Sequence, residues 1–138
     1  MSLTLSQQFS SLLRELHIQC NEIRGTVVAT AEGFLLAASG ELDNDIAAAT
    51  AVHISQVVDQ HLSLLQPAHS RDQLIWTDSG VWYITRLADE YILMAVAENH
   101  CTPGMLRLVS RNIDGAVRRM LDQAQQEVDR LSSPGAQD

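Results

Sequence analysis

The sequence contains no lysine, so all nine of its basic residues are arginines. With 17 acidic residues and neutral histidines, the formal net charge is −8. Binding to nucleic acid requires a basic surface that displaces counterions, and this charge balance therefore disfavours nucleic acid as a partner. Residues 1–102 hold four arginines against twelve acidic residues, whereas residues 103–131 hold five against four. The basic groups are thus concentrated toward the C-terminal end.

Cysteine is almost as scarce, since Cys20 and Cys101 are the only two and form no CxxC motif. Two free thiols in a reducing compartment are the favoured interpretation, with a disulfide as the alternative. The N-terminus lacks the basic flank and continuous apolar core of a signal peptide, and no apolar run approaches the roughly 20 residues that span a bilayer. We therefore expect a cytoplasmic protein without a membrane partner.

Motifs for catalysis and cofactor binding are also missing. The sequence has no GxxxxGK[ST], GxGxxG or GxSxG motif. His53 and His61 are eight residues apart, which does not suggest chelation from adjacent helical turns, and the pair His100-Cys101 has no companion at metal-ligand spacing. The acidic residues fall largely at predicted helix caps and turns, where local hydrogen bonding explains them. We expect no catalytic residues, no metal and no cofactor.

Hydrophobic periodicity predicts one domain over residues 1–131, followed by a disordered tail at 132–138. Strand 91–97 is apolar on both faces and is expected at the centre of a sheet, whereas the short strand ending at Trp76-Thr77 is expected at an edge. The order of elements predicts an α+β fold, an antiparallel sheet of five strands sandwiched between helices. The elements are a helix at 5–20, strands at 25–30 and 34–39 joined by a turn at Gly33, a helix from Asp43 to Pro67, strands at 73–77, 81–87 and 91–97, and a helix from Pro103.

The helix after Asp43 is more apolar than one buried face requires. A helix that covers a sheet needs a single apolar stripe, and here a second stripe lies beside the first, so we expect a contact surface for a partner. Thr50 and His61 lie between the stripes, either as satisfied structural residues or as a pH-sensitive contact between two copies of the helix. The first stripe contains Ala47, Ala51, Ile54, Val58, Leu62 and Leu65, and the second contains Ile46, Val57 and Leu64.

The final helix carries a stripe of arginines. Thr102-Pro103 is a typical helix start. Arg107, Arg111 and Arg118 line up on one side, interleaved with acidic residues. A solvated face of weak ion pairs explains the pattern, and a basic contact patch for an acidic partner is the alternative. The buried stripe is expected to contain Leu106, Val109, Ile113, Val117, Met120 and Ala124, with Val128 and Leu131 as candidate members.

Two segments resemble a known family. The hairpin from Gly25 to Gly40 (GTVVATAEGFLLAASG), leading into the alanine-rich helix from Asp45, resembles the N-terminal half of Roadblock/dynein-light-chain domains. The strand YILMAVA at 91–97, followed by TPGML at 102–106, resembles the closing strand and final helix of that family. The element order agrees over residues 5–124. The resemblance implies a Roadblock/profilin-like fold, with one helix on one face of the sheet and two on the other.

The resemblance also implies a homodimer in which the second helices pack together and the third strands pair. It further implies a non-catalytic module that binds or regulates a small Ras-like GTPase and scaffolds a signalling complex. The expected dimer interface contains Ile46, Ala49, Thr50, His53, Val57, His61, Leu64, Leu74, Ile75 and Trp76, and the candidate partner surface contains Ser55, Gln56, Asp59, Ser63, Arg107, Arg111 and Arg118.

A small-molecule sensor domain is the alternative function, because related sheet-and-helix folds bind ligands in a pocket beneath one helix. Against it, the sequence shows few polar residues that could converge in such a pocket.

Overall fold

The structure is a computed structural model that describes residues 3–132. The predicted order of elements is confirmed, and the final helix ends at Ser132, so the rest of the predicted tail lies outside the described residues. The elements are α1 (Leu5–Gln19), β1 (Ile23–Thr30), β2 (Leu35–Gly40), α2 (Asn44–Leu65), β3 (Asp72–Trp76), β4 (Val81–Leu87), β5 (Tyr91–Ala97) and α3 (Pro103–Ser132).

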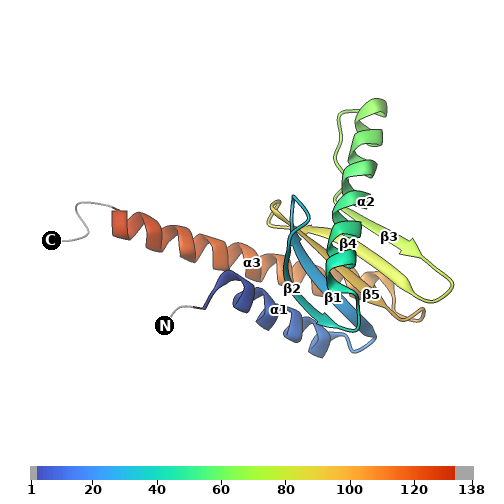
Figure 1. Ribbon diagram of the computed structural model, residues 1–138, viewed down its shortest axis with the longest axis horizontal. Helices are drawn as coiled ribbons and strands as arrows, with labels where there is room; N and C mark the ends of the chain where they lie inside the picture. Colours follow the sequence, from blue (N-terminus) through green and yellow to red (C-terminus); the bar gives the residue numbers. More distant parts are fainter. Residues whose placement is uncertain (1–2, 133–138) are drawn as a thin grey trace.

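The five strands form one antiparallel sheet in the order β2-β1-β5-β4-β3 (Figure 1). Every residue of β5 is buried, which confirms its predicted central place. β3 is an edge strand, as its short length and its exposed tryptophan indicated. The turn between β1 and β2 contains Gly33 at φ 94°, a left-handed conformation that glycine adopts without a steric penalty.

Helices cover the two faces of the sheet unequally (Figure 1). On one face α1 and α3 pack together over large side chains, including Phe9, Leu13 and Leu106, all fully buried. The ring of Phe9 meets that of Tyr91 edge-on, with centroids 5.0 Å apart. On the other face α2 packs alone, through small residues such as Ala48. The arrangement of two helices against one is as expected.

Both long helices extend beyond the part of the sheet that they cover. The C-terminal end of α2 stands clear of the strands, and the distal half of α3 runs past α1 (Figure 1). Leu65 is consequently 84% exposed, and Val128 and Leu131 are also exposed, as is Ala124. Their prediction as buried residues is wrong because periodicity identifies the face of a helix but not how far the sheet beneath it extends.

Within residues 3–132, no helix is both long enough and apolar enough to cross a membrane.

Candidate functional site

The outward face of α2 carries the second apolar stripe. Asp43 caps the helix by accepting a hydrogen bond from the Ile46 backbone N–H at 3.3 Å. The inner face rests on the sheet through Ala47, Ala48, Ala51, Val52 and Ser55, so the stripe beside it faces away from the core. Ile46 is 65% exposed and Leu64 81% exposed. Ala49, His53, Val57 and His61 are also exposed, and Thr50 is partly buried.

One of the two polar residues between the stripes has a local partner. His61 Nδ1 lies 2.9 Å from the backbone carbonyl of Val57, one turn earlier in the same helix. This contact supports the interpretation of His61 as a satisfied structural residue.

The second predicted part of the interface is the edge strand. β3 pairs with β4 from Asp72 opposite Thr85 to Trp76 opposite Val81, and in the described chain it has no strand on its other side. Leu74 and Trp76 are exposed, while Ile75 packs against the cluster beneath α2. An edge strand of this kind presents unpaired backbone groups to any second strand that approaches it.

Two residues of the candidate partner surface are not free to contact a partner. Ser55 is only 4% exposed, which corrects its assignment to an exposed polar side, because it follows Ala48 by seven residues and shares the inner face. Asp59 also turns toward the fold, accepting hydrogen bonds from the backbone N–H of Ser70 at 2.8 Å and from its hydroxyl at 2.7 Å. It also forms an ion pair with Arg86.

The surroundings of Asp59 have opposing effects on its acidity. Burial alone would raise the pKa of the carboxyl group. The hydrogen bonds from Ser70 and the positive charges of Arg86 and His69 outweigh burial, so the pKa lies below its ordinary value of 3.8. By contrast, Gln56 and Ser63 remain exposed on α2.

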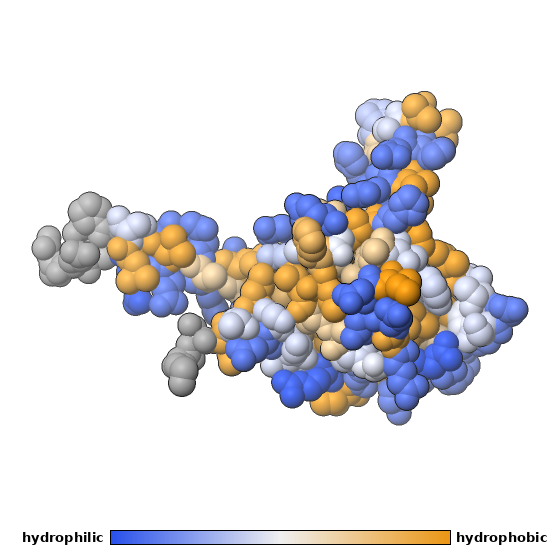
Figure 2. All heavy atoms as spheres, viewed as in Figure 1, coloured by the Kyte–Doolittle hydropathy of each residue, from blue (hydrophilic) through white to orange (hydrophobic). Residues whose placement is uncertain are grey.

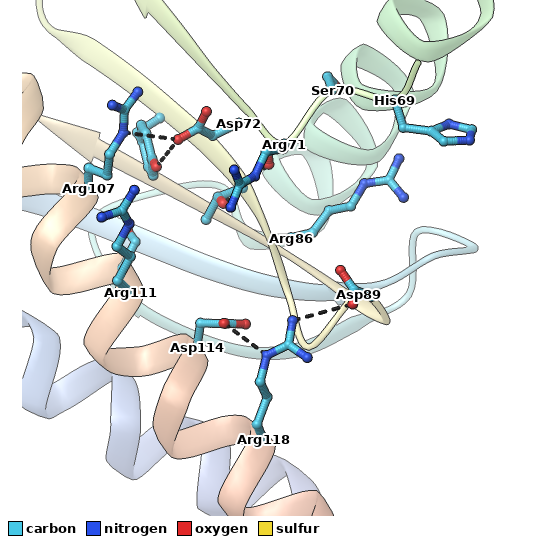
Figure 3. A pocket seen from close by; sticks show the side chains of 13 residues that line it. His69, Ser70, Arg71, Asp72, Arg86, Asp89, Arg107, Arg111, Asp114 and Arg118 are labelled. Atoms are coloured by element: carbon cyan, nitrogen blue, oxygen red, sulfur yellow. Dashed lines mark hydrogen bonds and ion pairs between the residues drawn. The ribbon is translucent and has the colours of Figure 1, made fainter. Parts of the chain in front are cut away.

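The arginines of the candidate partner surface, Arg107, Arg111 and Arg118, lie on the other face of the sheet, where they line a hollow of about 510 Å³ (Figure 3). One wall of the hollow is a polar stripe of α3 that lies beside the buried stripe of that helix. The opposite wall is formed by β4 and by the segment that leads into β3. The expectation that few polar residues converge in a pocket is therefore wrong, because folding brings residues 69–72 next to α3. The lining is His69, Ser70, Arg71, Asp72, Tyr83, Thr85, Arg86, Asp89, Arg107, Ser110, Arg111, Asp114 and Arg118.

Most charged groups in the hollow are paired. Arg107 Nε lies 3.4 Å from Asp72, whose carboxylate also accepts a hydrogen bond from the Tyr83 hydroxyl at 2.5 Å. Burial and the neighbouring Asp72 raise the pKa of Tyr83 to about 12. Arg118 bonds to Asp114 at 3.0 Å and to Asp89 at 3.3 Å. The interpretation of the arginine stripe as ion pairs thus holds for Arg107 and Arg118.

The two cysteines meet where α1 ends and α3 begins. Both are buried free thiols, with their Sγ atoms 3.7 Å apart. Together with Glu22 they place three potential metal-ligand atoms within 4.8 Å of one another. Structural zinc sites use four ligands, so this group supplies one donor too few, and we assign no metal to it.

Comparison with known proteins identifies the family. The model of the Roadblock/LC7 domain matches residues 10–97, so the chain belongs to the Roadblock/LC7 domain family. No curated protein matches the sequence. Many solved structures share the fold, among them those of other Roadblock/LC7 domains.

Myxococcus xanthus MglB is 13% identical and superposes with a TM-score of 0.79, covering 89% of this chain and 94% of that one. A structure described as MglB with a tetrameric arrangement is 16% identical, with a TM-score of 0.76 and coverage of 90% and 96%. Acanthamoeba castellanii profilin IA is 11% identical, with a TM-score of 0.58 and coverage of 79% and 95%. The fold is therefore of the Roadblock/profilin type, as expected.

Proposed function

We propose that this protein is a non-catalytic, homodimeric Roadblock module that binds or regulates a small Ras-like GTPase and scaffolds a complex. The exposed second stripe of α2 carries the proposal. Ile46 and Leu64 stand on the face of the helix that is turned away from the sheet. Burying apolar surface of this kind contributes roughly 25 cal/mol per Å², and a second copy of α2 would bury it.

The edge strand supports the same arrangement. Two copies of β3 related by a two-fold axis would run antiparallel, and each would satisfy the backbone groups that the other leaves unpaired. The small Ala49 on the outer face of α2 lets a second helix approach closely. One solved structure of the same fold is described as MglB with a tetrameric arrangement, which supports self-association.

A dimer would duplicate the exposed polar groups of α2 about one axis. Gln56 and Ser63 are the members of the candidate partner surface that are exposed on this helix. A GTPase seated across both copies would contact a composite surface that no monomer has. Because the switch segments of such GTPases are ordered by the γ-phosphate, the GTP-bound and GDP-bound forms should bind with different affinity.

The first experiment tests the GTPase. Small Ras-like GTPases from the source cell, loaded with GDP or a non-hydrolysable GTP analogue, are titrated with the protein by calorimetry, and GTP hydrolysis is followed in parallel. We expect binding that depends on the nucleotide. Equal and negligible binding to every GTPase in both states, with unchanged hydrolysis, would overturn the regulatory role and leave a dimeric scaffold.

The second experiment tests the dimer with a matched pair of variants. Val57→Asp places a charge in the proposed contact, where an unpaired buried charge is strongly unfavourable, so sedimentation should shift from dimer to monomer while the circular dichroism spectrum is retained. Leu108→Asp makes the same change at an exposed site on α3 and should leave the dimer intact. A folded Val57→Asp dimer would contradict the interface.

A further inference from the structure

The hollow beside α3 is built from one face of that helix. Arg107, Ser110, Arg111, Asp114 and Arg118 follow one another at helical spacing and all line it. Opposite them stand the end of β4 and the segment that enters β3, in which Asp72 pairs with Thr85. The hollow is therefore framed by elements of regular structure rather than by loops alone (Figure 3).

The acidic groups of the hollow are already occupied. Asp72 bonds to Tyr83 and Arg107, while Asp89 bonds to Arg118. Asp114 accepts a hydrogen bond from the Ala88 backbone N–H at 2.6 Å as well as its contact with Arg118. Two arginines thus face three carboxylates, and these groups together leave one negative charge.

Two arginines are left over. Among residues 3–132, neither Arg71 nor Arg111 forms an ion pair. Both are exposed toward solvent, and both belong to the lining. Arg86 is balanced by Asp59, so the two remaining arginines outweigh the one negative charge left by the pairs above. In a protein of net charge −8, the hollow thus holds a surplus of one positive charge, to which an anion would be attracted.

A second observation points to a ligand. Ser110 lies in the lining and is only 4% exposed, yet its Oγ has no hydrogen-bond partner in the described part of the chain. The Nε atom of Arg86 is also buried and unpartnered, but this side chain points toward α2, where it pairs with Asp59. Buried polar atoms are nearly always hydrogen-bonded, and a ligand with acceptor oxygens would satisfy the hydroxyl of Ser110.

We propose that this hollow binds a small molecule carrying a phosphate or diphosphate group. Arg111 and Arg71 hold the anionic oxygens, for which the planar guanidinium offers paired donors, and the Ser110 hydroxyl donates a further hydrogen bond. The volume of about 510 Å³ falls within the range of roughly 300–1,000 Å³ that is typical of small-molecule sites, so an organic group fits beside the phosphate. The proposal does not depend on the dimer or on a GTPase.

Pyrophosphate is the probe, titrated by calorimetry into the intact protein at constant ionic strength. Arg111→Ala and Arg71→Ala should each weaken binding roughly tenfold or more, since each removes a charge-assisted contact. Ser110→Ala should weaken it by a smaller factor. Arg119→Ala is the matched control, because Arg119 is an exposed arginine of the same helix that lies outside the lining, and it should bind like the unaltered protein.

Thermal unfolding provides an independent measurement, since a ligand that binds only the folded state raises the midpoint. Pyrophosphate should raise it for the unaltered protein and for Arg119→Ala, and less for Arg111→Ala. If Arg119→Ala and Arg111→Ala weaken pyrophosphate binding equally, the attraction is diffuse electrostatics, and the proposed site is overturned. Absence of binding at millimolar pyrophosphate would also overturn the proposed site. The same holds if only an acidic protein, and not pyrophosphate, binds to the hollow.

Discussion

The two faces of the sheet differ in how many helices cover them and in the size of the side chains that those helices bury. On the face of α1 and α3, two helices bury large aliphatic and aromatic side chains in one cluster. On the other face a single helix lies on the sheet through alanines, and its outer side remains apolar and exposed. The first face therefore buries the larger part of the apolar core of the monomer, whereas the second leaves an apolar side of its helix exposed.

The largest effect is expected on the two-helix face. Leu13 is fully buried between α1 and the sheet, and Leu13→Ala should lower the free energy of unfolding by about 2–5 kcal/mol through lost burial and a cavity. Urea denaturation measures the change. Val52→Ala, on the inner side of α2, removes fewer atoms and should lower the free energy of unfolding by less. A larger decrease for Val52→Ala than for Leu13→Ala would contradict the comparison of the two faces.

An overpacking variant examines the one-helix face. Ala48 is fully buried against the sheet, so Ala48→Leu should force α2 outward and cost roughly 1–3 kcal/mol. Ala49→Leu makes the same change one residue along, on the exposed side, and should be nearly neutral in dilute solution. Equal costs for both variants in denaturation experiments would show that the inner and outer faces of α2 are not distinct.

The ion pair that ties α2 to β4 gives a prediction that depends on pH. The folded-state pKa of Asp59 lies below its ordinary value of 3.8, so its charged form stabilises the fold above that pH and the contribution is lost as pH falls through the folded-state value. Asp59→Asn should cost roughly 1–2 kcal/mol at pH 7. Between about pH 5 and pH 2, the free energy of unfolding of Asp59→Asn should fall by less than that of the unaltered protein. Denaturation midpoints follow this change.

Much of the fold could be predicted from local patterns. The caps at Asp43 and Thr102, the turn at Gly33 and the apolar strand 91–97 each depend on neighbouring residues, and each occurs as expected. Family resemblance then supplied the distribution of helices over the two faces.

The hollow could not be predicted in the same way. Its lining joins residues 69–72 to α3, and only tertiary packing brings these segments together. The polarity of Ser55 suggests exposure, but its helical spacing from Ala48 places it on the inner face, where it is buried. The helical spacing of residues 107, 110, 111, 114 and 118 indicates one wall of the hollow. It does not indicate the opposite wall, which other segments supply.

The smallest effect is expected on the outer stripe. Ile46 is mostly exposed, so Ile46→Ser should change the stability of the dilute monomer by no more than about 0.5 kcal/mol. At high protein concentration the unaltered protein should gain stability from self-association, and the variant should gain less. A concentration series of thermal unfolding curves distinguishes the two regimes. A large loss in the dilute monomer would mean that the monomer itself covers this side chain.

The buried pair of thiols provides a built-in reporter of opening. Burial and the hydrogen bond with Glu22 raise the pKa of Cys20 to about 12, and burial also raises the pKa of Cys101. Since the thiolate is the form that reacts with alkylating reagents, both buried sulfurs should react more slowly than an exposed thiol at neutral pH while α1 and α3 stay packed. Alkylation followed by mass spectrometry would therefore measure, without any added label, how often the junction between these helices opens.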